Sequence, residues 1–128
     1  MTNTSTGSPE VHGYHAHVYY DQDTLLAAER LRGALAANFP VELGSFNADP
    51  IGPHPVSQFA AIFKPDAFQT VIPWLMLHRE GLDILVHPLT NDMVDDHSLY
   101  ALWLGTPVAL KLDTIQRRGY GTALLPAA

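Results

Sequence analysis

Strand-like and helix-like segments follow one another in an order that restricts the fold of this chain more than any other feature. Four segments have the alternation, or the β-branched and aromatic content, of strands: 12–20, 41–46, 56–63 and 82–88. Apolar residues spaced three and four apart mark a helix between the first two and another between the last two: Leu25, Ala28, Leu31, Leu35; Phe68, Val71, Ile72, Leu75. This order predicts an α+β, ferredoxin-like split βαβ sandwich, with an antiparallel sheet and both helices on one face.

The ends of these segments are marked by capping and breaking residues. Asp21 is a predicted N-cap of the first helix, which Phe39-Pro40 closes. The second helix is expected to open at Lys64-Pro65-Asp66 and to stop by Gly81, with a kink or break at Pro73, which lacks a backbone donor. Segments 97–105 and 107–115 are candidates for extra C-terminal strands.

The size and composition of the chain limit its class. The 128 residues suit a polar leader, 1–10, expected to be disordered, and a single domain, 11–128. The leader lacks the basic start and apolar run of a secretion signal, and no apolar run approaches the roughly 20 residues of a membrane span, so we expect a cytoplasmic protein without membrane contact. A net charge of −6 with seven basic residues argues against nucleic acid as a partner.

The stretch YHAHVYYD carries the first candidate site residues. On a strand, His15 and His17 would point to the same side, about 7 Å apart along the backbone. Because the chain has no cysteine, a transition metal here would require histidine or carboxylate ligands. The pair by itself also fits two ordinary surface histidines.

The expected topology adds two more histidines to this pair. We expect the third strand to lie parallel to the first on one side and the fourth antiparallel on the other, so that the starts of the first and third strands meet the end of the fourth. His54 precedes the third strand and His87 ends the fourth. Leu82, Ile84 and Val86 should face the helices, which would send His87 to the opposite face, together with His15 and His17.

Four imidazoles at one corner predict a metal or proton-transfer site. Neutral imidazole suits iron, zinc, copper and nickel, and a site of three ligands leaves coordination positions open for catalysis. His97 is either a nearby acid or base or a solvated ring, and Asp95 or Asp96 could supply a carboxylate. The competing interpretation is that the histidines are purely structural. His12 and His78 are expected at the surface.

Several motifs together resemble a known family. YHAHVYYD, GPHP, LVHPLTNDMVDDH and ALWLG are similar to segments of the DOPA 4,5-dioxygenase family, fungal pigment enzymes with bacterial relatives. The resemblance covers about residues 14–105 and implies a non-haem iron enzyme that opens a catechol ring with dioxygen by extradiol-type cleavage. It also implies a homodimer, for which the open sheet face and Trp103 could serve.

The resemblance places five histidines on the family's histidine positions: His15, His17, His54, His87, His97. Geometry favours the first four as ligands of Fe(II), with zinc or nickel possible after purification. A normal site would use three of the four, which leaves one of them, or His97, for proton transfer; His97 and His17 are the predicted catalytic residues. The alternative function is a non-catalytic dimeric ferredoxin-like module that binds a metal or a small aromatic ligand.

Overall fold

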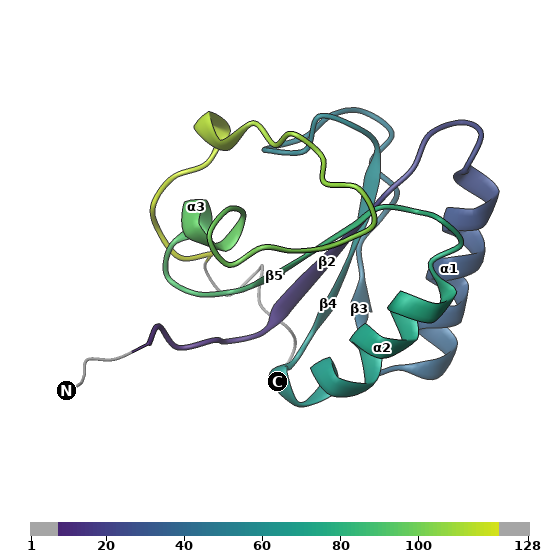
Figure 1. Ribbon diagram of the computed structural model, residues 1–128, viewed down its shortest axis with the longest axis horizontal. Coiled ribbons are helices and arrows are strands. Elements are labelled where there is room, and N and C mark those ends of the chain that lie inside the picture. Colours follow the sequence, from purple (N-terminus) through teal and green to yellow (C-terminus); the bar gives the residue numbers. More distant parts are fainter. Residues whose placement is uncertain (1–7, 121–128) are drawn as a thin grey trace.

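The computed structural model describes residues 8–120 and has an α+β architecture, as predicted (Figure 1). A five-stranded antiparallel sheet has the order β3-β4-β2-β5-β6. Its strands are β2 (Tyr14–Tyr19), β3 (Glu42–Leu43), β4 (Gln58–Phe63), β5 (Ile84–Pro88) and β6 (Leu102–Leu104). The helices are α1 (Leu25–Asn38), α2 (Phe68–His78) and the short α3 (Met93–Asp96), with 3-10 turns η1 (Pro65–Ala67) and η2 (Leu112–Thr114).

The two long helices cover one face of the sheet, while α3 and the segment that follows β6 lie on the other side (Figure 1). Alternation decides which strand residues meet the helices, and these are Ala16 and Val18 of β2, Phe59, Ala61 and Phe63 of β4, and Ile84 and Val86 of β5. They pack against six of the eight helix residues that the spacing singled out: Ala28, Leu31, Leu35, Val71, Ile72, Leu75. Of the other two, Phe68 is partly buried against the core and Leu25 is exposed, contrary to the expectation. The hydrophobic core therefore leaves the odd-numbered positions of β2 facing away from the helices.

The direction of β4 differs from the expectation. β4 is antiparallel to β2, with Tyr14 opposite Phe63 and Tyr19 opposite Gln58. The crossover through α1 returns β3 parallel to β2, and β4, which follows β3 after a reversal of the chain, lies between them and runs antiparallel to both. The start of β4 thus lies beside the end of β2, and the predicted meeting of the two strand starts is wrong.

Three local expectations also need correction. α1 begins at Leu25 with Thr24 as its N-cap residue, and Asp21 instead exchanges hydrogen bonds with Thr24. α2 continues through Pro73 without a break. Pro73 cannot donate a hydrogen bond to the Gln69 carbonyl, but both residues are exposed, so water can take the place of the missing donor. Of the two candidate C-terminal strands only β6 forms, while the second segment contains η2.

The predicted division into leader and domain stays a prediction. Residues 1–7 lie outside the described part of the chain, and residues 8–10 are in neither helix nor strand. Within residues 8–120, no helix is both long and apolar enough to cross a bilayer.

Candidate metal centre

Two neighbouring strands place three histidines on the face opposite the long helices. His15 and His17 alternate with the core residues Ala16 and Val18, and His15 lies directly opposite His87 in the β2–β5 register. Directly opposite residues of antiparallel strands have Cβ atoms about 5 Å apart, so their rings meet. The ring centroids of His15 and His87 are 5.1 Å apart, and those of His17 and His87 also 5.1 Å.

His54 reaches the same face from the loop between β3 and β4. Ile51 and His54 bridge a tight turn through two backbone hydrogen bonds, and Gly52 between them has φ +55°, a left-handed conformation that glycine adopts without strain. The turn brings the His54 ring to 4.1 Å from that of His17, and Tyr19 Oη lies 2.7 Å from His54 Nδ1. His54 thus joins the cluster from a loop that folds over the sheet.

His97 reaches the cluster from the end of α3. Asp92 caps this helix by accepting hydrogen bonds from the backbone N–H groups of Val94 and Asp95. His97 Nδ1 donates to the carbonyl of Met93 at 2.7 Å, and its ring centroid lies 4.0 Å from that of His87. A short capped helix thus fixes the orientation of the fifth imidazole.

The five imidazoles form a single buried group, which we call the histidine cluster: His15, His17, His54, His87, His97. None of them is more than 9% exposed. Two sets of three have ligand atoms within 4.8 Å of one another, His15 with His17 and His87, and His17 with His54 and His97. His17 belongs to both sets, so it is the centre of the cluster.

Hydrogen bonds to carbonyl oxygens fix which ring nitrogens carry lone pairs. His17 Nδ1 donates to Gln58 Oε1 at 2.9 Å, and His87 Nδ1 donates to the carbonyl of Pro88 at 2.9 Å. In the neutral rings this leaves both Nε2 atoms without a proton, yet they lie 3.0 Å apart. Two lone pairs at this distance repel unless a cation lies against both.

The environment favours the neutral form of these rings. Burial lowers the pKa of His17 and of His87 well below the usual value, and nearby imidazoles lower both further. The pKa of His54 falls to about 4, first because of burial and then because of His97 and His15. Burial also lowers the pKa of His97. These four rings are therefore neutral near pH 7, the state in which imidazole binds a metal.

The donor set fits a transition metal ion. Two nitrogens that each lie about 2.1 Å from one ion at right angles are about 3.0 Å apart, the separation of the Nε2 atoms of His17 and His87. Both rings have their other nitrogen held by an oxygen acceptor, the arrangement that orients metal-binding histidines. In the described residues the groups with ligand spacing contain histidines only.

Comparisons with known proteins agree with the motif resemblance. The model of the Dopa 4,5-dioxygenase family matches residues 14–114. The chain belongs to this family. A curated relative, the DOPA 4,5-dioxygenase of Amanita muscaria, is 35% identical over 112 residues, which cover 80% of this chain and 49% of the relative.

Two further relatives extend the comparison. An uncharacterised 21.2 kDa protein of Botryotinia fuckeliana is 36% identical over 120 residues, covering 87% of this chain and 64% of that protein. The chain thus spans about half of the length of the first of these curated relatives and less than two thirds of the second. A solved structure of a candidate dioxygenase from Nostoc punctiforme is 51% identical, with a TM-score of 0.80 over 81% of this chain and 90% of that one.

The structure brings together all five histidines that the sequence singled out, and leaves the suggested carboxylates outside the ligand groups. Asp96 instead accepts hydrogen bonds from Thr90 and Tyr120, and Asp95 pairs with Arg117. His12 and His78 are exposed, as expected. Trp103 is half-buried and stacks on Tyr19, with ring centroids 6.0 Å apart. Which histidines bind metal in this member of the Dopa 4,5-dioxygenase family stays a prediction.

Three residues of the site were not found from the sequence. Gln58 holds His17, Tyr19 holds His54, and the ring of Tyr120 lies 5.9 Å from that of His15. Gln58 and Tyr19 are opposite each other on β4 and β2, so a correct strand direction would have placed them beside the cluster. Tyr120 lies in no regular element and gives no periodic signal.

Replacing Gln58 with leucine should weaken metal binding. Gln58 is 3% exposed and accepts the proton of His17 Nδ1, so its loss frees the ring to change tautomer or rotate. Removing such a partner of a ligand typically lowers metal affinity about 10- to 100-fold. Competition with a chelator would measure this, with Gln69→Leu on the exposed side of α2 as the control. Equal affinity in the two variants would contradict the role of Gln58.

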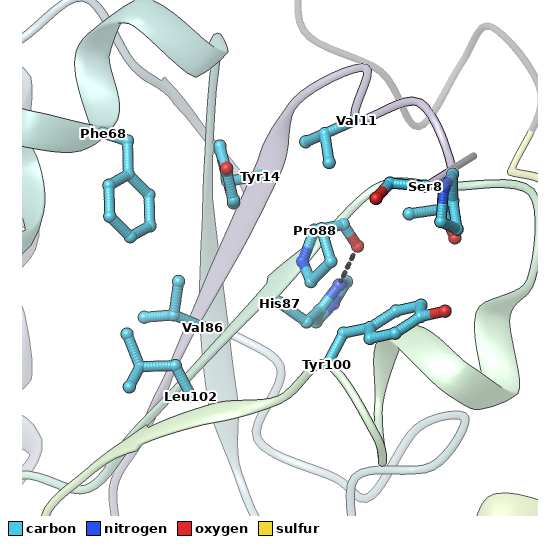
Figure 2. A pocket seen from close by; sticks show the side chains of 11 residues that line it. Ser8, Val11, Tyr14, Phe68, Val86, His87, Pro88, Tyr100 and Leu102 are labelled. Carbon is cyan, nitrogen blue, oxygen red and sulfur yellow. Dashed lines mark hydrogen bonds between the residues drawn. The ribbon is translucent and has the colours of Figure 1, made fainter. Parts of the chain in front are cut away.

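An apolar pocket of about 380 Å³ adjoins the cluster at His87 (Figure 2). Tyr14, Phe68, Tyr100 and Leu102 contribute to its wall, and the described residues that line it include no acidic residue, lysine or arginine. Its size is within the range of small-molecule sites. An uncharged ring would fit this lining better than an ionic group.

Proposed function

We propose that the protein is an extradiol-type dioxygenase that opens the ring of DOPA or a related catechol at a ferrous centre in the histidine cluster. The convergence of the Nε2 lone pairs of His17 and His87 in a buried group of histidines is the observation that carries the proposal. Membership of the Dopa 4,5-dioxygenase family and the solved dioxygenase relative support the reaction class.

The ligands in this proposal are His15, His17 and His87. They form one of the two sets with ligand spacing, and all three are on paired strands, which hold a site more rigidly than loops do. Three neutral ligands leave the charge of the ion intact and so favour a bound catecholate. A ferrous ion with open positions would bring catechol and dioxygen into contact and pass charge between them.

The other two histidines are free for proton transfer. His97 and His54 lie within 6.2 Å and 4.1 Å of His17 by ring centroids, and neutral imidazole can accept a phenolic proton. His97, whose Nδ1 is held by Met93, has Nε2 available as the base and later as the acid. His17 then serves as a ligand at the reacting centre.

The apolar pocket beside His87 supports an aromatic substrate. The pocket is lined with aromatic and aliphatic side chains, and His87 belongs to both the pocket and the cluster. The reaction consumes one dioxygen, and both of its oxygen atoms enter the product, so no external reductant is needed.

Iron reconstitution under anaerobic conditions tests the proposal. Metal-free protein loaded with Fe(II) and then exposed to oxygen and DOPA or another catechol should form a yellow semialdehyde, with one oxygen consumed per product. The His97→Ala variant should keep its iron and lose at least about a hundredfold in rate, the usual range for an acid–base residue. Iron binding without product over a broad catechol panel would favour the non-catalytic module instead.

Two wider predictions belong to the same proposal. A homodimer is one, and the exposed Leu99, Tyr100 and Leu102 at the β6 edge offer it an apolar contact surface. Sedimentation equilibrium would measure the assembly state. A cytoplasmic location is the other.

A further inference from the structure

The last described segment of the chain brings an aromatic ring to the histidine cluster. The Tyr120 ring centroid lies 5.9 Å from that of His15, 6.1 Å from His87 and 6.5 Å from His97. Its ring is nearly parallel to that of His97, at 11°. Tyr120 is therefore close to three of the five imidazoles, although the family model ends at residue 114.

Polar contacts hold this segment, residues 116–120, against α3; we call it the C-terminal strap. Arg117 Nη1 donates to Asp92 Oδ2 at 2.8 Å and to Asp95 Oδ1 at 2.9 Å. The backbone N–H of Met93 donates to the carbonyl of Arg118 at 3.0 Å. These contacts fix the strap along the helix that also carries His97.

A buried carboxylate sets the position of the Tyr120 ring. The Tyr120 hydroxyl donates to Asp96 Oδ2 at 2.8 Å, and Asp96 has no exposed surface. The same carboxylate accepts hydrogen bonds from the backbone N–H and the hydroxyl of Thr90. Asp96 therefore connects the strap to Thr90 in the segment that follows β5, the strand that carries His87.

Apart from the hydrogen bond between Tyr120 and Asp96, the strap is held by exposed contacts. The Arg117 side chain is 63% exposed, and exposed ion pairs contribute only about 0.2–1 kcal/mol each. None of the strap residues belongs to the hydrophobic core. The strap can therefore separate from α3 without unfolding the sheet, which makes its effect on the cluster measurable by itself.

We propose that Tyr120 is a positioning and size-selecting residue of the metal centre, held over the histidine cluster by the C-terminal strap. The inference rests on the proposed function, because it requires a metal at the cluster. The phenol ring limits how solvent and the substituent of a catechol approach the ligands, while its hydroxyl is occupied by Asp96. Residue 120 therefore acts through the space that its ring fills and takes no proton from the substrate.

Extraction of the metal by a chelator tests the inference without relying on catalysis. Wild-type, Tyr120→Ala, Tyr120→Phe and Arg117→Ala proteins are loaded with Co(II), mixed with excess EDTA, and followed by the loss of cobalt absorbance. Opening a local cover should raise the rate constant about tenfold or more in Tyr120→Ala and Arg117→Ala. Tyr120→Phe keeps the ring but loses its hydrogen bond to Asp96, so its rate constant should lie between those of wild type and Tyr120→Ala.

Arg118→Ala is the matched control for charge. It removes the same charge from the same strap, but the hydrogen bonds that the structure shows for Arg118 use its backbone only. Its extraction rate should equal that of wild type. Thermal melting of each loaded protein verifies the fold. If Tyr120→Ala does not fold, Arg117→Ala carries the test, because the Arg117 side chain pairs with the surface carboxylates of Asp92 and Asp95.

A second measurement tests selection by size. The ratio of kcat/KM for 4-tert-butylcatechol to that for catechol should rise about tenfold in Tyr120→Ala and stay unchanged in Arg118→Ala, because a pocket contact of this size discriminates by roughly that factor. Equal extraction rates in wild type, Tyr120→Ala and Arg117→Ala would overturn the inference alone. Wild-type protein that binds no cobalt would overturn the proposed centre, and the inference with it.

Discussion

Replacing His17 with alanine is expected to remove the metal from the protein almost completely. His17 belongs to both sets of imidazoles with ligand spacing, so neither set of three survives the substitution. Losing a residue that only supports a ligand lowers metal affinity by up to about a hundredfold. Losing a ligand itself should therefore lower the affinity by more than that. Metal analysis after dialysis against a weak chelator would measure the loss, and ring-opening activity should disappear with it.

The other histidine variants separate the two sets of possible ligands. His15→Ala and His87→Ala should also lose metal, whereas His54→Ala should keep it and lose activity. His78→Ala is the matched control, because His78 is an exposed histidine on α2, bonded only to the Trp74 carbonyl and stacked on its ring. Full metal content in His17→Ala would show that the histidine cluster is not the metal centre.

Among the proposed substitutions, Asp96→Ala is expected to lower the free energy of unfolding most. The Asp96 carboxylate accepts three hydrogen bonds, from the Thr90 N–H at 2.9 Å, the Thr90 hydroxyl at 2.6 Å and the Tyr120 hydroxyl at 2.8 Å. Hydrogen bonds to a charged group contribute about 1.5–3 kcal/mol each, and the buried donors would be left unpaired. We expect the free energy of unfolding to fall by about 3–5 kcal/mol.

Chemical denaturation of the metal-free protein would measure this change. Asp49→Ala is a suitable control, since Asp49 is exposed in the loop between β3 and β4. Substitutions at such surface positions usually change stability by less than about 0.5 kcal/mol. A loss below about 1 kcal/mol in Asp96→Ala would contradict the structural role given to its three hydrogen bonds.

Local periodicity was enough to predict which face carries three of the site residues. Alternation along β2 and β5 puts His15, His17 and His87 on one face of the sheet and the core residues Ala16 and Val86 on the other. The structure has this arrangement. The pattern succeeds because burial of one face fixes the orientation of every second residue. The α+β fold was predicted from the order of the strand-like and helix-like segments along the chain.

The position of His54 could not be derived so directly. β4 runs opposite to the expected direction, and its start lies beside Tyr19 at the end of β2. His54 is nevertheless in the cluster because the turn at Gly52 folds the loop over the sheet. A loop path depends on tertiary contacts that no periodic pattern encodes, so the expected proximity was right for a wrong reason.

The supports of the cluster were the least predictable part of the site. Asp96 looked like a possible ligand in an acidic loop, but it accepts hydrogen bonds from Thr90 and from Tyr120, 24 residues further along the chain. Contacts of this kind join irregular segments, whose residues show no spacing that would indicate a shared site. Similarly, Pro73 looks like a helix breaker, yet α2 contains it on its exposed side.

The central claim is that the histidine cluster binds one metal ion through the Nε2 atoms of His17 and His87. A crystal of the iron-loaded protein, measured at the iron absorption edge, tests it most directly. We predict one anomalous difference peak per chain, about 2.1 Å from both Nε2 atoms and from a nitrogen of His15. Iron-loaded crystals without a peak in the cluster, or with their only peak elsewhere on the protein, would contradict the account.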